Sequence, residues 1–214
     1  MLQESKDLLR ALGIPVVQAP SEGEAQAAAM VRAGLCDFVA SQDFDCLLYG
    51  APRVVRHLSL SNRRKRINAL TYKTILPEVL ELQDVLSTLE LSLEQLRALG
   101  MIVGTDFNIG GVKGLGPKKG LALVRKHGED FAALFDEAGF DEACGVRWQD
   151  VISTIRSIPT SVDVELSWKE VDTEQLERIL VQEHDFSKER VASALHDLEK
   201  ARQQSRQTSL GRFF

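Results

Sequence analysis

Residues 14–45 carry the pattern that decides the fold: IPVVQAPSEGEAQAAAMVRAGLCDFVASQDFD. The apolar, largely β-branched residues 14–18 predict a buried strand, which Pro20 ends. The alanine-rich residues 21–33 predict a helix, and residues 37–41 predict a second short strand. Because a helix between two strands is the usual crossover of a parallel sheet, this stretch predicts an α/β fold.

Later residues extend this sheet and then become mostly helical. Residues 54–58 predict another strand, whereas residues 71–82 fit either a helix or a strand. Helices are predicted over residues 3–12, 92–104, 118–126, 148–156, 173–182 and 188–203. The expected architecture is therefore a mostly parallel sheet flanked by helices, followed by a helical region and a flexible, polar C-terminal tail.

Composition points to a folded protein. The 214 residues are 44% hydrophobic and 27% charged, with a formal net charge of −5, which argues against a mainly disordered chain. No run approaches the roughly 18 apolar residues of a membrane span, and the start lacks a signal-peptide pattern. Three cysteines without a Cys-x-x-Cys pair indicate neither a disulfide framework nor a zinc site. We expect an intracellular, non-secreted protein, cytoplasmic or nucleoid-associated in a prokaryote and nuclear in a eukaryote.

Basic residues gather in two blocks despite the acidic total. Residues 50–66 contain six and residues 108–127 contain five, and neither block contains an acid. Such blocks suit a polyanionic partner. Residues 128–150 contain seven acids and one arginine, so we expect a solvated face turned away from any polyanion.

Five carboxylates follow two predicted strand ends and one helix end: Glu22, Glu24, Asp43, Asp45 and Asp106. Ser21 and Glu24 alone fit a helix capping box, and the Asp-Phe-Asp sequence alone fits a turn. On an extended backbone, however, Asp43 and Asp45 would project to the same side. Carboxylates converging at one sheet edge suit divalent cations, above all magnesium. Two ions about 4 Å apart would serve phosphodiester hydrolysis.

Residues 112–120, VKGLGPKKG, predict a tight glycine turn that leads into a helix. The backbone amides at such a helix start point toward a phosphate, and the lysines add positive charge. With a helix on each side, the stretch resembles a helix-hairpin-helix, a module that grips the nucleic-acid backbone without reading bases. The DNA-binding candidates are Lys113, Gly114, Gly116, Lys118 and Lys119.

Taken together, residues 13–25, 41–48 and 103–108 and the hairpin resemble, in family order, the structure-specific 5′ nucleases. The resemblance is strongest to the XPG-type flap endonucleases of archaea and eukaryotes. It implies a magnesium-dependent flap endonuclease and 5′–3′ exonuclease of DNA replication and repair. It also implies that the five carboxylates hold two Mg²⁺ ions in the complete enzyme, and that backbone carbonyls at the hairpin hold K⁺.

The C-terminal residues resemble a sliding-clamp-binding motif, Gln207-x-x-Leu210-x-x-Phe213-Phe214. One helical turn would place Leu210, Phe213 and Phe214 on one side as an apolar plug, with Gln207 at the pocket rim. The partners implied by the resemblance are branched 5′-flap DNA, a sliding clamp and a separate N-terminal nuclease chain, with no membrane partner.

The chain departs from the family pattern in two places. The family's N-terminal segment precedes the position of Met1, and its helical arch has no match. The basic residues Arg63, Arg64, Lys65 and Arg66 are therefore given no arch role, and a solvated loop and a DNA contact remain open alternatives for them. The expected segments are an internal part of the nuclease core (1–106), the hairpin and helical region (107–203) and the clamp-binding tail (204–214).

Three readings of function remain open. The chain is the C-terminal, larger part of a flap endonuclease and needs an N-terminal segment for full activity; this is the reading we favour. Alternatively, it is a non-catalytic module that binds branched DNA and the clamp. In the third reading it is a shortened sequence with the same chemistry as the first and no partner chain.

Overall fold

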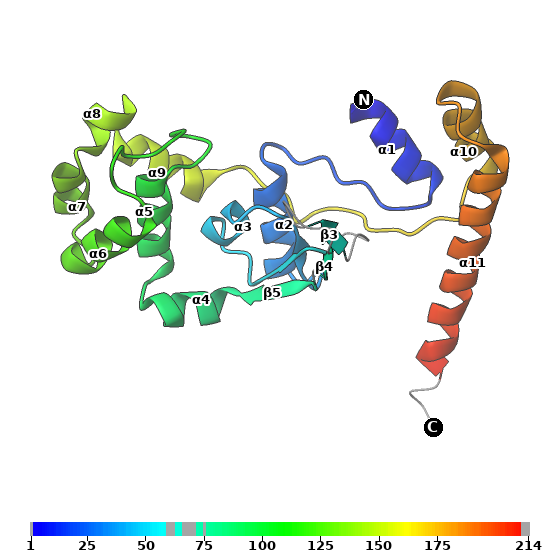
Figure 1. The fold of residues 1–214 in the computed structure, drawn as a ribbon, viewed down its shortest axis with the longest axis horizontal. Helices are drawn as coiled ribbons and strands as arrows, with labels where there is room; N and C mark the ends of the chain where they lie inside the picture. The colour runs from blue at the N-terminus through cyan, green and yellow to red at the C-terminus, as the bar shows by residue number, and fades with distance from the viewer. Residues whose placement is uncertain (1, 59–62, 66–71, 75, 211–214) are drawn as a thin grey trace. The chain divides into compact units, whose positions relative to one another are not determined.

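The computed structural model describes residues 2–58, 63–65, 72–74 and 76–210, and Figure 1 traces the chain. Residues 18–163 form one compact unit, the central unit, and residues 1–17 with 164–214 form a second, the discontinuous unit. The boundaries of these units differ from those of the predicted segments 1–106, 107–203 and 204–214. The units are defined by compact packing, whereas the segments were defined by sequence motifs. Those motif-based segments stay a prediction.

The central unit contains a small sheet and most of the helices. Its strands are β1 (Val39–Ala40), β2 (Arg53–Arg56), β3 (Arg63–Lys65), β4 (Tyr72–Thr74) and β5 (Glu78–Glu81). Its helices are α2 (Gly23–Arg32), α3 (Asp45–Leu48), α4 (Leu82–Leu89), α5 (Leu93–Val103), α6 (Pro117–His127), α7 (Phe131–Ala138), α8 (Phe140–Cys144) and α9 (Trp148–Ser157). In Figure 1, α2 and α3 lie beside the sheet, while α5 to α9 gather at the other end of this unit.

The sheet confirms the α/β class but is mixed rather than mostly parallel. Strand β1 pairs in parallel with β2, with Val39 opposite Val54, and β2 pairs antiparallel with β5. Strands β3 and β4 form a separate antiparallel pair. The basic residues 63–65 therefore lie in a strand, where a loop was one of the two alternatives.

The strand predicted at residues 14–18 is wrong. These residues join no ladder in the part of the chain that the structure describes, although Ile14 to Val17 are half-buried. A strand requires a neighbour for its backbone groups, and Pro15 lacks an N–H donor. The apolar, β-branched residues within 14–18 therefore indicated partial burial correctly, but they did not indicate whether the segment pairs with a strand.

Helix starts follow local chemistry only in part. Helix α5 begins as predicted, because the Ser92 side chain accepts from the Gln95 N–H and the Gln95 side chain accepts from the Ser92 N–H. Helix α2 begins one residue after Glu22, which is its N-cap and makes no side-chain capping bond. The capping box considered for Ser21 and Glu24 is therefore not formed.

The core of the central unit lies between the sheet, α3 and the helices α5 to α9. Met101 and Ile102 of α5 are fully buried, as are Leu134 of α7 and Phe140 of α8. The side chain of Gln26 is also buried, because its amide donates to the Ser161 carbonyl at 2.6 Å and accepts from the Ser161 N–H at 2.9 Å. This exchange ties α2 to the segment that follows α9.

The discontinuous unit consists of α1 (Leu2–Ala11), α10 (Thr173–Glu177), a π-helical segment (Arg178–Glu183) and α11 (Lys188–Leu210). Gly13 accepts a backbone hydrogen bond from Lys169 at 3.0 Å, which holds the two parts of the chain together. Helix α11 runs through residues 204–210, so most of the predicted flexible tail is helical. Neither glycine nor proline interrupts this stretch. None of the helices described is long and apolar enough to cross a membrane.

Candidate metal and nucleic-acid site

The first two candidate acids lie at the start of α2. Glu22 is the N-cap residue with an extended backbone, and Glu24 lies in the first turn. Both side chains are half-buried. The amide groups of a helix N-terminus favour negative charge, so this position stabilises carboxylates without neutralising them.

Asp43 and Asp45 do not lie on an extended strand, so that prediction is wrong. The Asp43 carboxylate accepts from the Asp45 N–H at 3.1 Å, and Asp45 is the first residue of α3. The Ser41 hydroxyl accepts from the Asp43 N–H at 3.1 Å. The turn alternative therefore describes the backbone, because short polar side chains bond to amides two residues on.

The acids nevertheless share one electrostatic environment. Burial, and then the negative charges of Asp43, Asp106 and Glu24, together raise the pKa of Asp45 from 3.8 to about 6. Within the described part of the chain, no basic group opposes this shift. Tyr49 lies in the same electrostatic environment. Burial raises the pKa of its hydroxyl, and nearby negative charges raise it further: those of Asp45, Glu22, Asp106 and Glu24. The charges of Asp43, Asp106 and Glu24 therefore act on Asp45, and the charge of Glu22 acts on the nearby Tyr49.

This acid site has oxygen donors but is not a closed ligand cage. Among the residues described, no three His, Cys, Asp or Glu side chains lie close enough together to hold one metal ion. None of the five acids forms an ion pair with a basic side chain in these same residues. Uncompensated carboxylates fit a hard divalent cation in charge and in donor type.

Asp106 lies on a loop whose neighbours are fixed by buried hydrogen bonds. The Thr105 hydroxyl donates to the Asn108 amide oxygen at 2.7 Å, and the Asn108 amide nitrogen donates to the Met101 carbonyl at 2.6 Å. Thr105 and Asn108 are buried, whereas Asp106 between them is exposed. The loop therefore turns the Asp106 carboxylate outward from the end of α5.

Two glycines permit this loop to fold back on α5. Gly104 has φ +124°, and a Cβ atom there would lie 2.8 Å from the Gly111 nitrogen. At Gly111, with φ +58°, a Cβ atom would lie 2.4 Å from the Ile102 carbonyl oxygen. Since real Cβ atoms do not approach so closely, both positions require glycine, and the Asp106 loop leads directly into the hairpin.

The hairpin connects α5 to α6, with Gly114 at φ +89° and Gly116 as the N-cap of α6. The described residues provide no ion-pair partner for three exposed lysines: Lys113, Lys118 and Lys119. Lys126, further along α6, instead pairs with Glu137 at 2.6 Å. The free charges of this region are therefore concentrated at the hairpin and the first turn of α6, where unpaired amides also lie.

Two arginines of the other basic block, Arg53 and Arg56, have acidic partners. Arg53 pairs with Glu81 at 2.5 Å, and Arg56 pairs with Glu78 at 3.2 Å across the antiparallel β2–β5 pair. The Arg56 guanidinium also lies 4.1 Å from the ring centroid of Phe44. These arginines therefore have local structural partners in the sheet.

Only two of the four clamp-motif residues lie within the described part of the chain. Gln207 and Leu210 belong to the last turns of α11. Phe213 and Phe214 lie outside the described residues.

Sequence reasoning did not single out Tyr49 or Asn108. Tyr49 follows α3 and carries no motif, so only the fold places its ring among the acids. Asn108 stood in the quoted stretch 103–108, but its burial depends on the folding back of the loop. An asparagine near glycines is typical of a turn, and no local pattern distinguished the buried Asn108 from an exposed turn asparagine.

Comparisons with known proteins agree with the family resemblance. Residues 13–106 match the family model of the XPG I-region. The chain is 42% identical over 214 residues to flap endonuclease 1 of Pyrococcus abyssi, covering all of this chain and 61% of that protein. The solved flap endonuclease-1 of Methanococcus jannaschii matches with a TM-score of 0.75 and 38% identity over 89% of this chain and 54% of that one.

A more distant structure shares the fold. The catalytic core of Rad2 in complex with DNA substrate matches with a TM-score of 0.68 and 19% identity, over 92% of this chain and 69% of that chain. The chain spans about three fifths of the length of the curated relatives it matches.

Proposed function

We propose that this chain, which is related along its whole length to the XPG-type flap endonucleases, supplies the larger part of a metal-dependent 5′ flap endonuclease. The observation that carries the proposal is the electrostatic coupling of Asp45 to three other carboxylates, none of which has an ion-pair partner among the described residues. The substrate is branched DNA with a 5′ flap, and the reaction is phosphodiester hydrolysis in replication and repair. Endonuclease and 5′–3′ exonuclease activities share this chemistry.

The metal ligands in this proposal are Glu22, Glu24, Asp43, Asp45 and Asp106, and the expected ions are two Mg²⁺. Bound magnesium activates a water molecule and stabilises charge on the leaving oxygen. The raised pKa of Asp45 supports this assignment, because a nearby cation favours the ionised carboxylate that the other acids disfavour. Glu22 and Glu24 approach from the start of α2, and Asp106 approaches from the loop after α5.

The hairpin holds the DNA backbone away from the acids. Lys118 and Lys119 bind phosphates as point charges at the start of α6, and Lys113 extends the same surface. Gly114 and Gly116 allow the backbone to approach the strand closely. The K⁺ ion that the family resemblance implies at this hairpin is part of the same proposal.

The tail extends the proposal to a sliding clamp, through Gln207, Leu210, Phe213 and Phe214. The separate N-terminal nuclease chain remains a proposed partner, and the expected compartment is the one that contains the DNA.

The decisive experiment is cleavage of a labelled 5′-flap DNA by the purified chain with magnesium, alone and with the N-terminal part of a flap endonuclease relative added as a separate polypeptide. We expect cleavage with the added part and none when EDTA replaces magnesium. No cleavage in either case, with branched-DNA binding intact, would favour a non-catalytic branched-DNA and clamp-binding module. The lack of a closed three-ligand group among the described residues is the observation that keeps this second function in view.

A further inference from the structure

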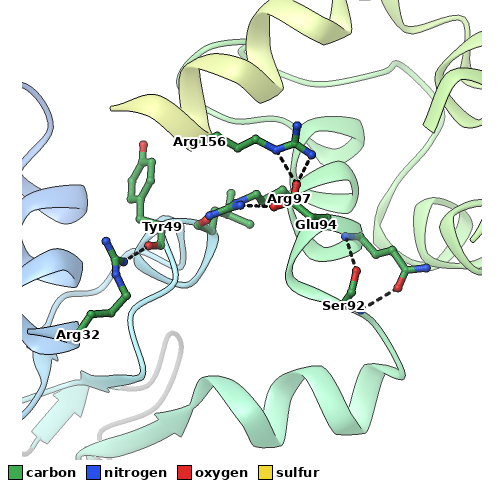
Figure 2. A network of polar contacts seen from close by, with 8 residues as sticks. Arg32, Tyr49, Ser92, Glu94, Arg97 and Arg156 are labelled. Atoms are coloured by element: carbon green, nitrogen blue, oxygen red, sulfur yellow. Dashed lines mark hydrogen bonds and ion pairs between the residues drawn. The ribbon is translucent and has the colours of Figure 1, made fainter. Parts of the chain in front are cut away.

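Three arginines from three helices line one pocket of the central unit (Figure 2). Arg32 ends α2, Arg97 lies in the middle of α5, and Arg156 lies in the last turn of α9. The pocket has a volume of about 340 Å³, and no carboxylate lines it. Its position is fixed, because the Gln26 side chain and the Ser161 backbone tie the segment after α9 to α2.

The charges of these arginines are not balanced. Arg97 and Arg156 share a single carboxylate, that of Glu94, and the Arg156 Nε lies 2.7 Å from it. Arg32 donates to the backbone carbonyl of Tyr49, which carries no charge, and it has no ion pair within the described part of the chain. Three positive groups thus face one negative group, which leaves an excess of two positive charges.

Like charges are held close together here at a cost. Partial desolvation and then the charge of Arg97 lower the pKa of Arg32, although the Arg32 residue as a whole is exposed. The Arg97 side chain is only 13% exposed, whereas the Arg156 side chain is 45% exposed and reaches solvent. A site with this charge excess gains from a bound anion, because the anion offsets the repulsion between the guanidinium groups.

All three guanidinium groups keep donors that no partner within the described residues uses. Arg32 uses Nη1 for Tyr49 and keeps Nε and Nη2, Arg156 uses Nε and Nη2 and keeps Nη1, and Arg97 keeps Nη2. Thr160 adds a hydroxyl at the pocket wall. Several donors around one small cavity match the oxygens of a phosphate group, which guanidinium forks bind in preference to other small anions of lower charge.

We propose that the pocket formed by Arg32, Arg97 and Arg156 binds a phosphate group, and that in the nuclease this is a backbone phosphate of the DNA. The second part rests on the proposed function. The pocket adjoins the acid site, since its wall includes Ala25, which follows Glu24, and Tyr49, whose ring lies among the acids. A strand that crosses the acids can therefore place another of its phosphates against the arginines.

The first test uses inorganic phosphate and no DNA, so its result is independent of nuclease activity. Phosphate binding to the full chain is measured by isothermal titration calorimetry at constant ionic strength. We expect Arg32→Gln and Arg156→Gln each to weaken binding about tenfold, because each removes a charged hydrogen-bond donor. Glu94→Gln should strengthen binding, since it removes the sole counter-charge while keeping a side-chain oxygen.

Arg147→Gln is the matched control, because Arg147 is an exposed arginine of the same unit that pairs with Asp150 at 2.8 Å and lies outside the pocket. It should leave phosphate binding unchanged. Equal affinities for the parent chain, Arg32→Gln and Glu94→Gln, or equal losses in Arg32→Gln and Arg147→Gln, would overturn the proposal. Circular dichroism melting curves confirm that each variant is folded.

The second test identifies the source of the phosphate. Binding of a fluorescent 5′-flap DNA is measured against salt concentration, and Arg32→Gln should reduce the salt slope by about one. Phosphate affinity that depends on Arg32 together with an unchanged DNA slope would assign the pocket to a free phosphate and overturn the DNA part. Lys118→Gln, at the hairpin, tests the proposed function separately in the same assay.

Discussion

The hairpin and the acid site differ in the charge that each presents within the described part of the chain: the hairpin carries unpaired lysines, whereas the acid site carries carboxylates without a counter-charge. At the hairpin, Gly114 permits the turn into α6, and Lys113, Lys118 and Lys119 are exposed without an ion-pair partner among the described residues. At the acid site, the charges of three other carboxylates act on Asp45, and none of the ion pairs among the described residues balances them. In the proposed function, the hairpin would therefore need no further group to bind nucleic acid, whereas the acid site would need a bound cation to balance its charge. Binding and cleavage should consequently respond to different substitutions.

The largest effect is expected at the acid site. Asp106→Ala or Asp43→Ala should lower magnesium-dependent cleavage of 5′-flap DNA about a thousandfold, because each removes an oxygen ligand worth several kcal/mol in the transition state. DNA binding in calcium should stay within about threefold of the parent, since phosphate contacts at the hairpin dominate affinity. Cleavage is measured in the active assembly with excess enzyme.

Asp150→Asn provides the control for that experiment, because Asp150 is an exposed acid that pairs with Arg147. It should leave cleavage unchanged. Parent-like cleavage by Asp43→Ala would remove Asp43 from the metal site, and parallel losses of binding and cleavage would remove the distinction between the two regions.

The hairpin should show the converse behaviour. Replacing both Lys118 and Lys119 by Gln should weaken binding to duplex-containing DNA about tenfold at moderate salt and reduce the salt slope by about two, because two phosphate contacts are lost. Fluorescence anisotropy across salt concentrations measures both quantities. Lys126→Gln removes one charge from the same helix, but Lys126 is paired with Glu137, so its slope should remain that of the parent. Identical slopes for all three proteins would place the DNA elsewhere.

A smaller effect tests the support beneath Asp106. Asn108→Ala should lower the free energy of unfolding by about 2 kcal/mol, because it leaves the buried Thr105 hydroxyl and Met101 carbonyl without their partner. Urea denaturation measures the change. Thr154→Ala removes an exposed hydroxyl that donates to the Asp150 carbonyl, and it should cost less than about 0.5 kcal/mol. Equal losses of unfolding free energy in the two variants would show that the buried hydrogen bonds of the Asp106 loop contribute no more than an exposed one.

The smallest expected effect is a gain in folding stability, whereas most substitutions lower stability. Without metal, Asp45→Asn should stabilise the chain by about 1 kcal/mol at pH 7, a value reduced for solvent screening. The folded pKa of about 6 exceeds the ordinary 3.8, so ionised Asp45 disfavours the fold above pH 6. The penalty fades as the pH falls from 6 toward 4, and the gain should fade with it.

Thermal unfolding in EDTA across this pH range measures the Asp45 effect. Asp150→Asn should have the opposite sign, because Arg147 lowers the pKa of Asp150 and the substitution removes a favourable pair. A loss of stability in Asp45→Asn at pH 7 would mean that the acid site is already balanced within the chain.

The same contrast explains what could be predicted from the sequence. Helix α5 was predicted well, because Ser92, Gln95 and Gly104 act on their own neighbours in the chain. The strand at residues 14–18 was not, because pairing requires a distant partner that apolar spacing does not reveal. The five acids were found by motif, but their convergence depends on the packing of α2, α3 and α5. The three arginines at positions 32, 97 and 156 form no cluster in the sequence, so only the fold brings them together.

The loop that presents Asp106 also leads into the hairpin, with seven residues between Asp106 and Gly114. The loop packs closely against α5 at Gly104 and Gly111, and Asn108 hydrogen-bonds its middle to Met101, which opposes any change in its length. If the acids cut the strand and the hairpin holds the duplex, this short connection works as a ruler. Product length should then be uniform from one substrate to another, set by the protein backbone rather than by the base sequence being cut.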